Sequence, residues 1–234
     1  TISQDSLGYL WMGTRQGLIR YHSNNTTWFV PDVNDTLSLP HQVINCVETD
    51  KNKDVWICTN NGLCKFNRRL QNFIPVNYRY ENGATASKIV LSVIEDNDKM
   101  LLMDASCIGF LNLSNNKLER IGVNEMHNPR VMHKDANNNI WVGTLNGEVY
   151  RINTERKQVD KVIEARGSEV NSIYADKEGL WVGYQSHGAR KYSVNGEFIK
   201  QYIFPKKSSQ KRKNTSVRKI LKDKKGRLWI GAYE

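Results

Sequence analysis

A tryptophan-centred motif that returns at a regular spacing constrains the architecture of this chain, because repeats of about 20 to 50 residues form stacked supersecondary units. Each copy begins with Asp, passes through a turn and ends in an apolar run, as in Asp-Ser-Leu-Gly-Tyr-Leu-Trp-Met-Gly-Thr at residues 5–14. Leu102 occupies the Trp position in one copy, and the other copies centre on Trp11, Trp56, Trp141, Trp181 and Trp229. Successive copies lie 45, 46, 39, 40 and 48 residues apart.

Each copy has the pattern of a small antiparallel sheet. Residues 43–49 predict a first strand, with apolar residues six and three positions before Asp50. The Trp run does not alternate apolar with polar residues, which is typical of a strand buried on both faces. Asn61-Gly62 and Asn146-Gly147 predict two-residue hairpin turns into a third strand, and a shorter fourth segment follows.

Four strands in each period, with both sheet faces buried, are typical of a β-propeller blade. We therefore expect an all-β fold, in which residues 1–234 form one partial β-propeller domain of five blades plus part of a sixth. A blade cannot bury both faces alone, so the five Trp residues are predicted to pack between blades rather than to bind ligands. The Asp residues that precede each Trp strand are predicted to form turns, since an Asp side chain accepts hydrogen bonds from nearby backbone N–H groups.

The pattern Val-x-x-Ile-x-x-Asp, followed by Gly-x-Leu-Trp-Ile-Gly-Thr and Gly-Leu-x-Arg-Tyr, resembles the two-component regulator propeller repeat. The copy at residues 4–21 fits best, whereas the copy at Leu102 lacks the Trp, the following Gly and the Thr. That family occurs in the sensor regions of hybrid two-component proteins of gut Bacteroidetes. Its propellers have seven blades, so Thr1 and Glu234 are expected to bound a fragment of a larger propeller, with blade faces exposed at both ends.

The resemblance implies a sensor segment that detects a glycan breakdown product on the periplasmic side of the inner membrane. The implied parent chain is a membrane-anchored, dimeric receptor with further propeller and immunoglobulin-like modules, a histidine kinase and a domain that regulates transcription. No enzyme activity and no cofactor or metal are expected in this segment. No stretch of the sequence approaches the roughly 18 apolar residues that a membrane-spanning helix needs.

The net charge of +10 comes from one part of the chain. Residues 206–227 hold eleven basic residues against Asp223 alone, and the remainder is neutral. The segment, which includes Lys206, Lys207, Lys211, Arg212 and Lys213, is interpreted either as a contact for a sulfated or uronic oligosaccharide or as a solvated loop. Nucleic acid is a weaker third reading, because an extracytoplasmic location leaves none for it to bind.

Candidate ligand-binding residues come from the expected mouth of the propeller channel, where inner strands and the loops between second and third strands converge. Five positions before the turn Asp, the copies carry Asn45, Leu91, Arg130, Asn171 and Arg218. Polar groups there either bind sugar hydroxyls or acidic groups, or form an internally bonded ring. The same face is predicted to include the loop residues Arg15, Asn60, Asn61, His187, Tyr78, Arg79 and Tyr80.

Motifs for catalysis and phosphate binding are absent from the sequence, and the five histidines are dispersed. Two other functions stay open: a propeller lyase or hydrolase acting on acidic sugars, and a scaffold that binds protein partners. The four cysteines lack metal-site spacing. They are expected to be buried thiols, with Cys58 and Cys64 facing each other across a hairpin as the alternative.

Overall fold

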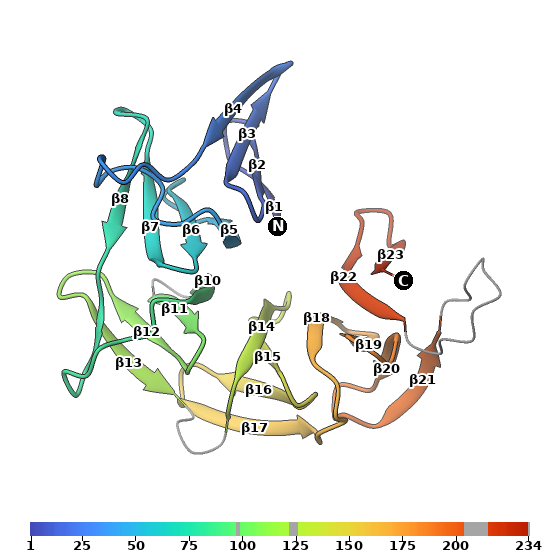
Figure 1. Ribbon diagram of the computed structural model, residues 1–234. Coiled ribbons are helices and arrows are strands. Elements are labelled where there is room, and N and C mark those ends of the chain that lie inside the picture. The colour runs from blue at the N-terminus through green and yellow to red at the C-terminus, as the bar shows by residue number, and fades with distance from the viewer. Residues whose placement is uncertain (97–98, 122–125, 204–214, 234) are drawn as a thin grey trace. The chain divides into compact units, whose positions relative to one another are not determined.

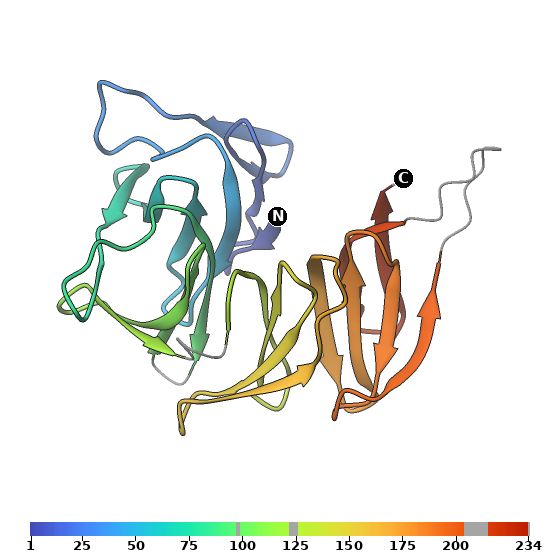
Figure 2. The ribbon, with the colours of Figure 1, turned by 60° about the horizontal axis from the view of Figure 1, so that its bottom comes forward.

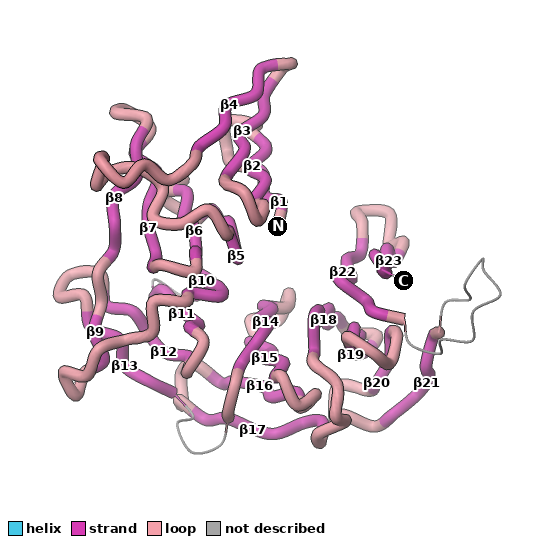
Figure 3. Tube along the Cα trace, viewed as in Figure 1, coloured by secondary structure: helices cyan, strands magenta, loops and turns pink. Residues whose placement is uncertain are grey.

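The computed structural model describes residues 1–96, 99–121, 126–203 and 215–233. In these residues every regular element is a β-strand (Figure 3), which confirms the all-β fold class. The chain divides into two compact units, Thr1–Ile121 and Gly122–Glu234. Each unit is described by itself.

The first unit contains three antiparallel sheets, each with its strands in chain order (Figure 1). The first is β1 (Ile2–Gln4), β2 (Leu10–Gly13), β3 (Leu18–His22) and β4 (Asn25–Phe29). The second is β5 (Ile44–Thr49), β6 (Val55–Thr59), β7 (Gly62–Asn67) and β8 (Asn72–Val76). The third is β10 (Val90–Asp96), β11 (Lys99–Asp104), β12 (Ile108–Asn112) and β13 (Lys117–Ile121). A short strand, β9 (Arg79–Tyr80), pairs in parallel with β13.

The second unit contains two four-stranded sheets and one two-stranded sheet among its described residues. The strands are β14 (Pro129–Lys134), β15 (Ile140–Thr144), β16 (Val149–Asn153) and β17 (Gln158–Ile163), then β18 (Val170–Asp176), β19 (Gly179–Tyr184), β20 (Ala189–Tyr192) and β21 (Phe198–Tyr202), then β22 (Ser216–Lys222) and β23 (Leu228–Tyr233). The sheet of β18–β21 lies between the other two (Figure 2).

Neighbouring sheets stack as propeller blades do. The innermost strand of a blade contacts the first two strands of the preceding blade: β5 lies on β1 and β2, β10 on β5 and β6, β18 on β14 and β15, and β22 on β18 and β19. The apolar cores therefore lie between blades. One core joins Trp11 to Ile57 and Phe66, and another joins Trp56 to Val93.

An Asp–Trp hydrogen bond recurs in four blades. Trp11 Nε1 donates to Asp5 at 2.9 Å, and the same bond joins Trp56 to Asp50, Trp141 to Asp135 and Trp229 to Asp223. In blade one, the other oxygen of Asp5 accepts the backbone N–H groups two and four residues on. One carboxylate thus shapes the turn and also satisfies the indole N–H of the next strand.

Two Trp residues depart from this arrangement. Trp181 follows its Asp by five residues instead of six, and Asp176 pairs with Lys222 of the next blade instead. Trp229 keeps its Asp bond, but its side chain is 54% exposed, whereas Trp11 and Trp141 are buried.

The glycine two residues after Trp lets adjacent blades approach closely. A Cβ added at Gly13 would lie 2.6 Å from Ile44 Cγ2, and one at Gly183 would lie 2.5 Å from Val217 Cγ1. Ile44 and Val217 are the apolar residues six positions before the Asp of the following blade. A branched side chain therefore fits against the glycine of the preceding blade, which explains why the motif carries both residues.

The predicted hairpin turn at Asn61-Gly62 is wrong by one residue. Thr59 pairs with Gly62, so the turn consists of Asn60 and Asn61. The Thr59 hydroxyl donates to Gly62 O and accepts from Asn61 N–H, which is a turn that Ser and Thr side chains form. Gly62 follows the turn at a φ of 110°, which favours glycine.

Blade three forms although it lacks the Trp motif. The structure corrects the predicted position by one residue: Leu101 occupies the place of Trp, because it pairs with Ile94, two residues before Asp96, as Trp56 pairs with Glu48. Leu102, the next residue, is fully buried in the core between blades two and three. At the Thr position stands Asp104, which is also fully buried. Its Oδ1 accepts the backbone N–H groups of Ser106 and Cys107, so a carboxylate performs the turn role of the Thr hydroxyl.

The cysteines are free and buried, which confirms the expectation, whereas the alternative in which Cys58 and Cys64 face each other across a hairpin is wrong. Cys58 pairs with Leu63, and Cys64 pairs with Ile57, so Cys58 and Cys64 lie on opposite faces of the sheet. The thiol opposite Cys58 is Cys46 on β5.

Candidate functional site

The five inner-strand positions predicted for the channel mouth share one backbone feature. In each inner strand the pairing register shifts at this residue, which is therefore a β-bulge; the residues are Asn45, Leu91, Arg130, Asn171 and Arg218. A bulge leaves the residue outside the strand ladder and redirects its side chain.

Two of these bulge residues bridge adjacent blades. Asn45 Nδ2 donates to Asn60 Oδ1 in its own blade at 2.9 Å and to Val90 O of the next blade at 2.8 Å. Asn171 Nδ2 makes the equivalent bonds to Gln185 Oε1 and Val217 O, both at 2.9 Å. The donor hydrogens of both amides are therefore engaged within the protein, as in an internally bonded ring.

The arginines of the second unit differ from the asparagines. Arg130 Nε donates to Glu169 Oε1 at 2.8 Å, an ion pair with a half-exposed guanidinium. Arg218 is exposed. Among the bulge residues of the second unit, Arg130, Asn171 and Arg218, only Arg218 presents a cationic group for which no ion pair with a described residue is seen.

The hairpin-loop residues occupy varied environments. Arg15 is exposed, Asn60 accepts the Asn45 bond, and Asn61 Nδ2 donates to Pro40 O at 3.2 Å. His187 packs edge-on against Tyr184. Burial lowers the pKa of His187, and the nearby Arg190 guanidinium lowers it further.

The backbone of Arg79 and Tyr80 lies apart from the inner strands, but the side chains of Tyr78 and Tyr80 reach Asp104, which pairs with Val90 at the start of inner strand β10. Arg79 and Tyr80 form β9 at the outer edge of blade three. The Tyr80 hydroxyl donates to Asp104 Oδ2 at 2.9 Å, and the Tyr78 hydroxyl donates to Ser87 O at 3.2 Å and also lies 3.5 Å from the same carboxylate. Burial, followed by the Asp104 charge, raises the pKa of both tyrosines.

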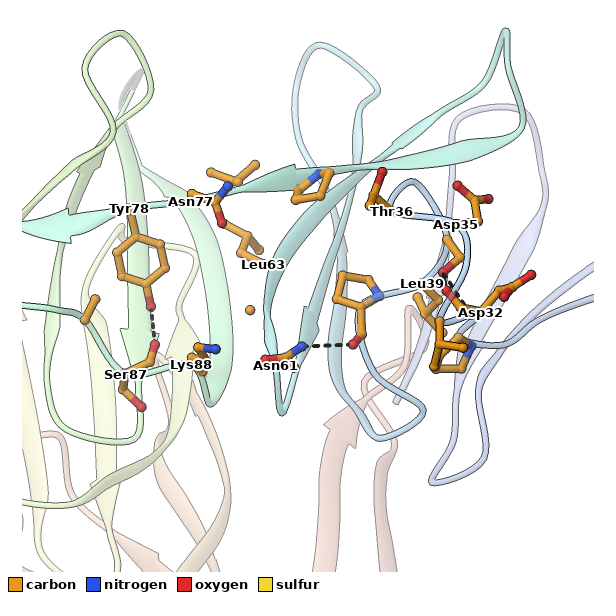
Figure 4. Close-up of a pocket in the computed structure, with 18 of the residues that line it drawn as sticks. Asp32, Asp35, Thr36, Leu39, Asn61, Leu63, Asn77, Tyr78, Ser87 and Lys88 are labelled. Atoms are coloured by element: carbon orange, nitrogen blue, oxygen red, sulfur yellow. Dashed lines mark hydrogen bonds between the residues drawn. The ribbon is translucent and has the colours of Figure 1, made fainter.

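A cavity of about 550 Å³ opens in the first unit between the segment joining blades one and two and the segment joining blades two and three. Figure 4 shows Tyr78, Ser87 and Lys88 on one side and Asp32 and Asp35 on the other. Asn61 and Leu63 lie between them. Of the candidates in the first unit, Asn61 and Tyr78 line this cavity, whereas Arg15, Asn45, Asn60, Arg79 and Tyr80 do not.

Sequence reasoning missed most residues of the cavity. Its charged residues are Asp32, Asp35 and Lys88, and three of the five prolines, Pro31, Pro40 and Pro75, also line it. The available indication was the length of two inter-blade connections, 30–43 and 77–89, which exceed a tight turn; the first carries Pro31 and Pro40.

Part of the basic segment lies outside the described residues, including Lys206, Lys207, Lys211, Arg212 and Lys213. Of its described members, Lys222 pairs with Asp176 and Glu178 at 2.8 and 3.1 Å. These hydrogen bonds raise the pKa of Lys222 to about 12. Arg227 pairs with Asp223 at 2.7 Å.

In the described ranges, no group of three or more His, Cys, Asp or Glu side chains could hold a metal ion. The same residues include no helix that is long and apolar enough to span a bilayer.

Antiparallel four-stranded blades with inter-blade cores define the β-propeller class. Residues 38–61 and 211–234 match the family model of the two component regulator propeller, so the resemblance noted from the repeat is confirmed. No curated protein matches the chain.

Solved structures share the fold. The extracellular domain of one hybrid two-component system of B. thetaiotaomicron is 19% identical with a TM-score of 0.76, over 99% of this chain and 30% of that one. A second such domain is 18% identical with a TM-score of 0.67, over 98% and 38%. A streptogramin B lyase is 15% identical with a TM-score of 0.69, over 98% and 74%. The chain thus spans about a third of the length of the two extracellular domains.

Proposed function

We propose that this chain is a ligand-sensing, extracytoplasmic propeller segment of a hybrid two-component receptor that detects a glycan breakdown product. The observation that carries the proposal is the match of two separate repeats to the two component regulator propeller model. The similarity in fold to extracellular domains of such systems supports it. Kinase activity and transcriptional regulation would belong to other parts of a membrane-anchored, dimeric parent chain.

The proposal assigns binding rather than catalysis to this segment. A propeller fold also supports enzymes, as the similar streptogramin B lyase shows, and a fold alone does not determine function. What supports binding is the similarity in fold to extracellular domains of hybrid two-component systems. The inner-strand amides of Asn45 and Asn171 are engaged within the protein and tie adjacent blades together, so they are not the proposed ligand contacts. A sensor needs a ligand that favours one arrangement of the protein over another.

Isothermal titration calorimetry of the chain tests the proposal, with three sets of probes: neutral, uronic and sulfated oligosaccharides. We expect at least one set to bind with a Kd below about 1 mM, which corresponds to about 4 kcal/mol. The bound saccharide should be recovered chemically unchanged. No heat with any of the three sets would contradict glycan sensing, and conversion of a saccharide to product would favour the enzyme alternative.

A further inference from the structure

We propose that the cavity of the first unit, which we call the proline pocket, binds a neutral saccharide. The pocket is formed by residues 31–40, 61–63, 75–78 and 85–88. This inference rests on the proposed function and adds a site and a ligand class to it. It differs from the expectation drawn from the basic segment, which favours an anionic glycan.

The pocket is held in shape before any ligand arrives. The loop 31–40 is closed by Ser38, whose hydroxyl accepts from Asp32 N–H at 2.9 Å and donates to Asp32 O at 3.0 Å. Leu37 O accepts the N–H of Phe73, which ties the loop to β8. The three lining prolines restrict their own backbone angles. A rigid site loses little conformational entropy on binding.

One wall of the pocket is acidic and has hydrogen-bonding capacity to spare. Asp32 Oδ1 accepts Asn34 N–H and Asp35 Oδ1 accepts Leu37 N–H, both at 2.9 Å. The Oδ2 atoms accept no hydrogen bond from the described part of the chain. Carboxylate oxygens accept charge-assisted bonds from hydroxyl groups, and they repel sulfate or uronate.

The opposite wall supplies complementary groups. Lys88 is exposed, and its ammonium forms no ion pair with a described residue. Asn77 is exposed, and its side-chain amide makes no hydrogen bond with the described residues. Tyr78 is positioned by Ser87 O and by the buried Asp104. Lys88 is the single basic residue of the lining against two carboxylates, so the pocket carries a net negative charge.

Part of the pocket lining is apolar. Leu39 and Leu63 line it but are each 1% exposed, so the accessible apolar surface comes from exposed or partly exposed residues that include Pro31, Val33, Pro40, Pro75 and Val76. A sugar ring presents C–H groups on its faces and hydroxyls around its edge, so a lining that combines apolar and polar groups fits it. The volume of about 550 Å³ lies within the range of small-molecule sites.

The test combines calorimetry with hydrogen exchange on the full chain. The probes are a panel of neutral mono- and disaccharides and a matched panel of uronic and sulfated ones. Ala86→Trp fills the pocket, since Ala86 lines it. Ala84→Trp is the control, because Ala84 is exposed in the same segment and does not line the pocket. Asp32→Asn and Asp35→Asn, alone and combined, remove the negative charge and keep a side-chain oxygen that can accept the backbone N–H of Asn34 or Leu37.

We expect a neutral saccharide to bind and to slow amide exchange in 31–40 and 75–88. Ala86→Trp should weaken binding at least about tenfold while Ala84→Trp leaves it unchanged, and the double Asn variant should weaken neutral binding and strengthen uronate binding. If a neutral saccharide binds with the same affinity to the Ala86→Trp variant, the pocket is not the binding site, although the proposal of glycan sensing stands. Pocket binding of only anionic saccharides would overturn the ligand class, and no binding by any saccharide would overturn both proposals.

Discussion

The Asp–Trp bond occurs twice in the second unit. The two carboxylates accept from equivalent positions, but the two Trp side chains differ in burial, which permits an internally controlled experiment. Asp135 accepts two backbone N–H groups, the Asn139 side chain and Trp141 Nε1, all at 2.9 Å. Asp223 likewise accepts two backbone N–H groups, the Arg227 side chain and Trp229 Nε1. Trp141 is 2% exposed, whereas Trp229 is 54% exposed.

Replacing the Asp removes the acceptor in both blades, but water reaches only one of the indoles. In Asp135→Ala the indole N–H is left unsatisfied in the core, which costs about 1–3 kcal/mol. Loss of the turn bonds adds about 1 kcal/mol. We therefore expect Asp135→Ala to lower the free energy of unfolding by about 3 kcal/mol. Asp223→Ala should have a clearly smaller effect, because solvent satisfies the freed donors.

Urea unfolding followed by far-UV circular dichroism measures both variants. Asp135→Asn adds a graded control, since an amide keeps one acceptor oxygen for the turn but presents its NH₂ group or a weaker acceptor to the indole. We expect the free energy of unfolding of Asp135→Asn to lie between the values for wild type and Asp135→Ala. Equal losses for Asp135→Ala and Asp223→Ala would refute the argument, because they would show that burial of the indole does not determine the cost.

Three further outcomes follow from the packing. Gly183→Ala should lower the free energy of unfolding by about 1–3 kcal/mol, because the added methyl group overpacks against Val217. Gly231 is at the equivalent position with open space around it, so Gly231→Ala should have little effect. Equal denaturant midpoints for the two variants would contradict this. Burial lowers the pKa of His133 to about 4 and Lys219 adds to the shift, so the unfolded chain alone gains this proton between about pH 6.5 and 4. Unfolding free energy should fall by roughly 3 kcal/mol across that window as pH decreases, and His133→Gln should remove that part of the pH dependence. Burial raises the pKa of Cys58 and Cys64, and that of Cys107 to about 12, so thiol labelling at pH 8 should be slow until denaturant is added; rapid native labelling would count against it.

The repeat determined the fold prediction because its period and strand patterns come from local chemistry that every blade repeats. Blade three was located from its spacing, but the residue in the place of Trp is Leu101 rather than the predicted Leu102, since the turn after Asp96 is one residue shorter. The detailed turn geometry was less predictable. The Thr59 hydroxyl selects the turn one residue before Asn61-Gly62, and propensity alone does not include that bond.

The candidate site was predictable only in part, because it depends on contacts between segments distant in sequence. The inner-strand positions were found as a set, yet their bulges and the inter-blade bonds of Asn45 follow from stacking. Asp32 and Asp35 resemble ordinary turn formers in the sequence. Only the folded chain places them across a cavity from Lys88.

Asp104 suggests how a repeat protein acquires a distinctive feature. In blades one, two and four the Asp–Trp bond and the Thr turn both serve the structure of the blade, and we expect changes there to cost stability. Blade three has given up both, and its buried carboxylate is free to hold the hydroxyls of Tyr78 and Tyr80. The degenerate copy of a repeat is therefore a useful guide in related chains: the blade that departs from the consensus marks the neighbourhood in which to look for a specific site.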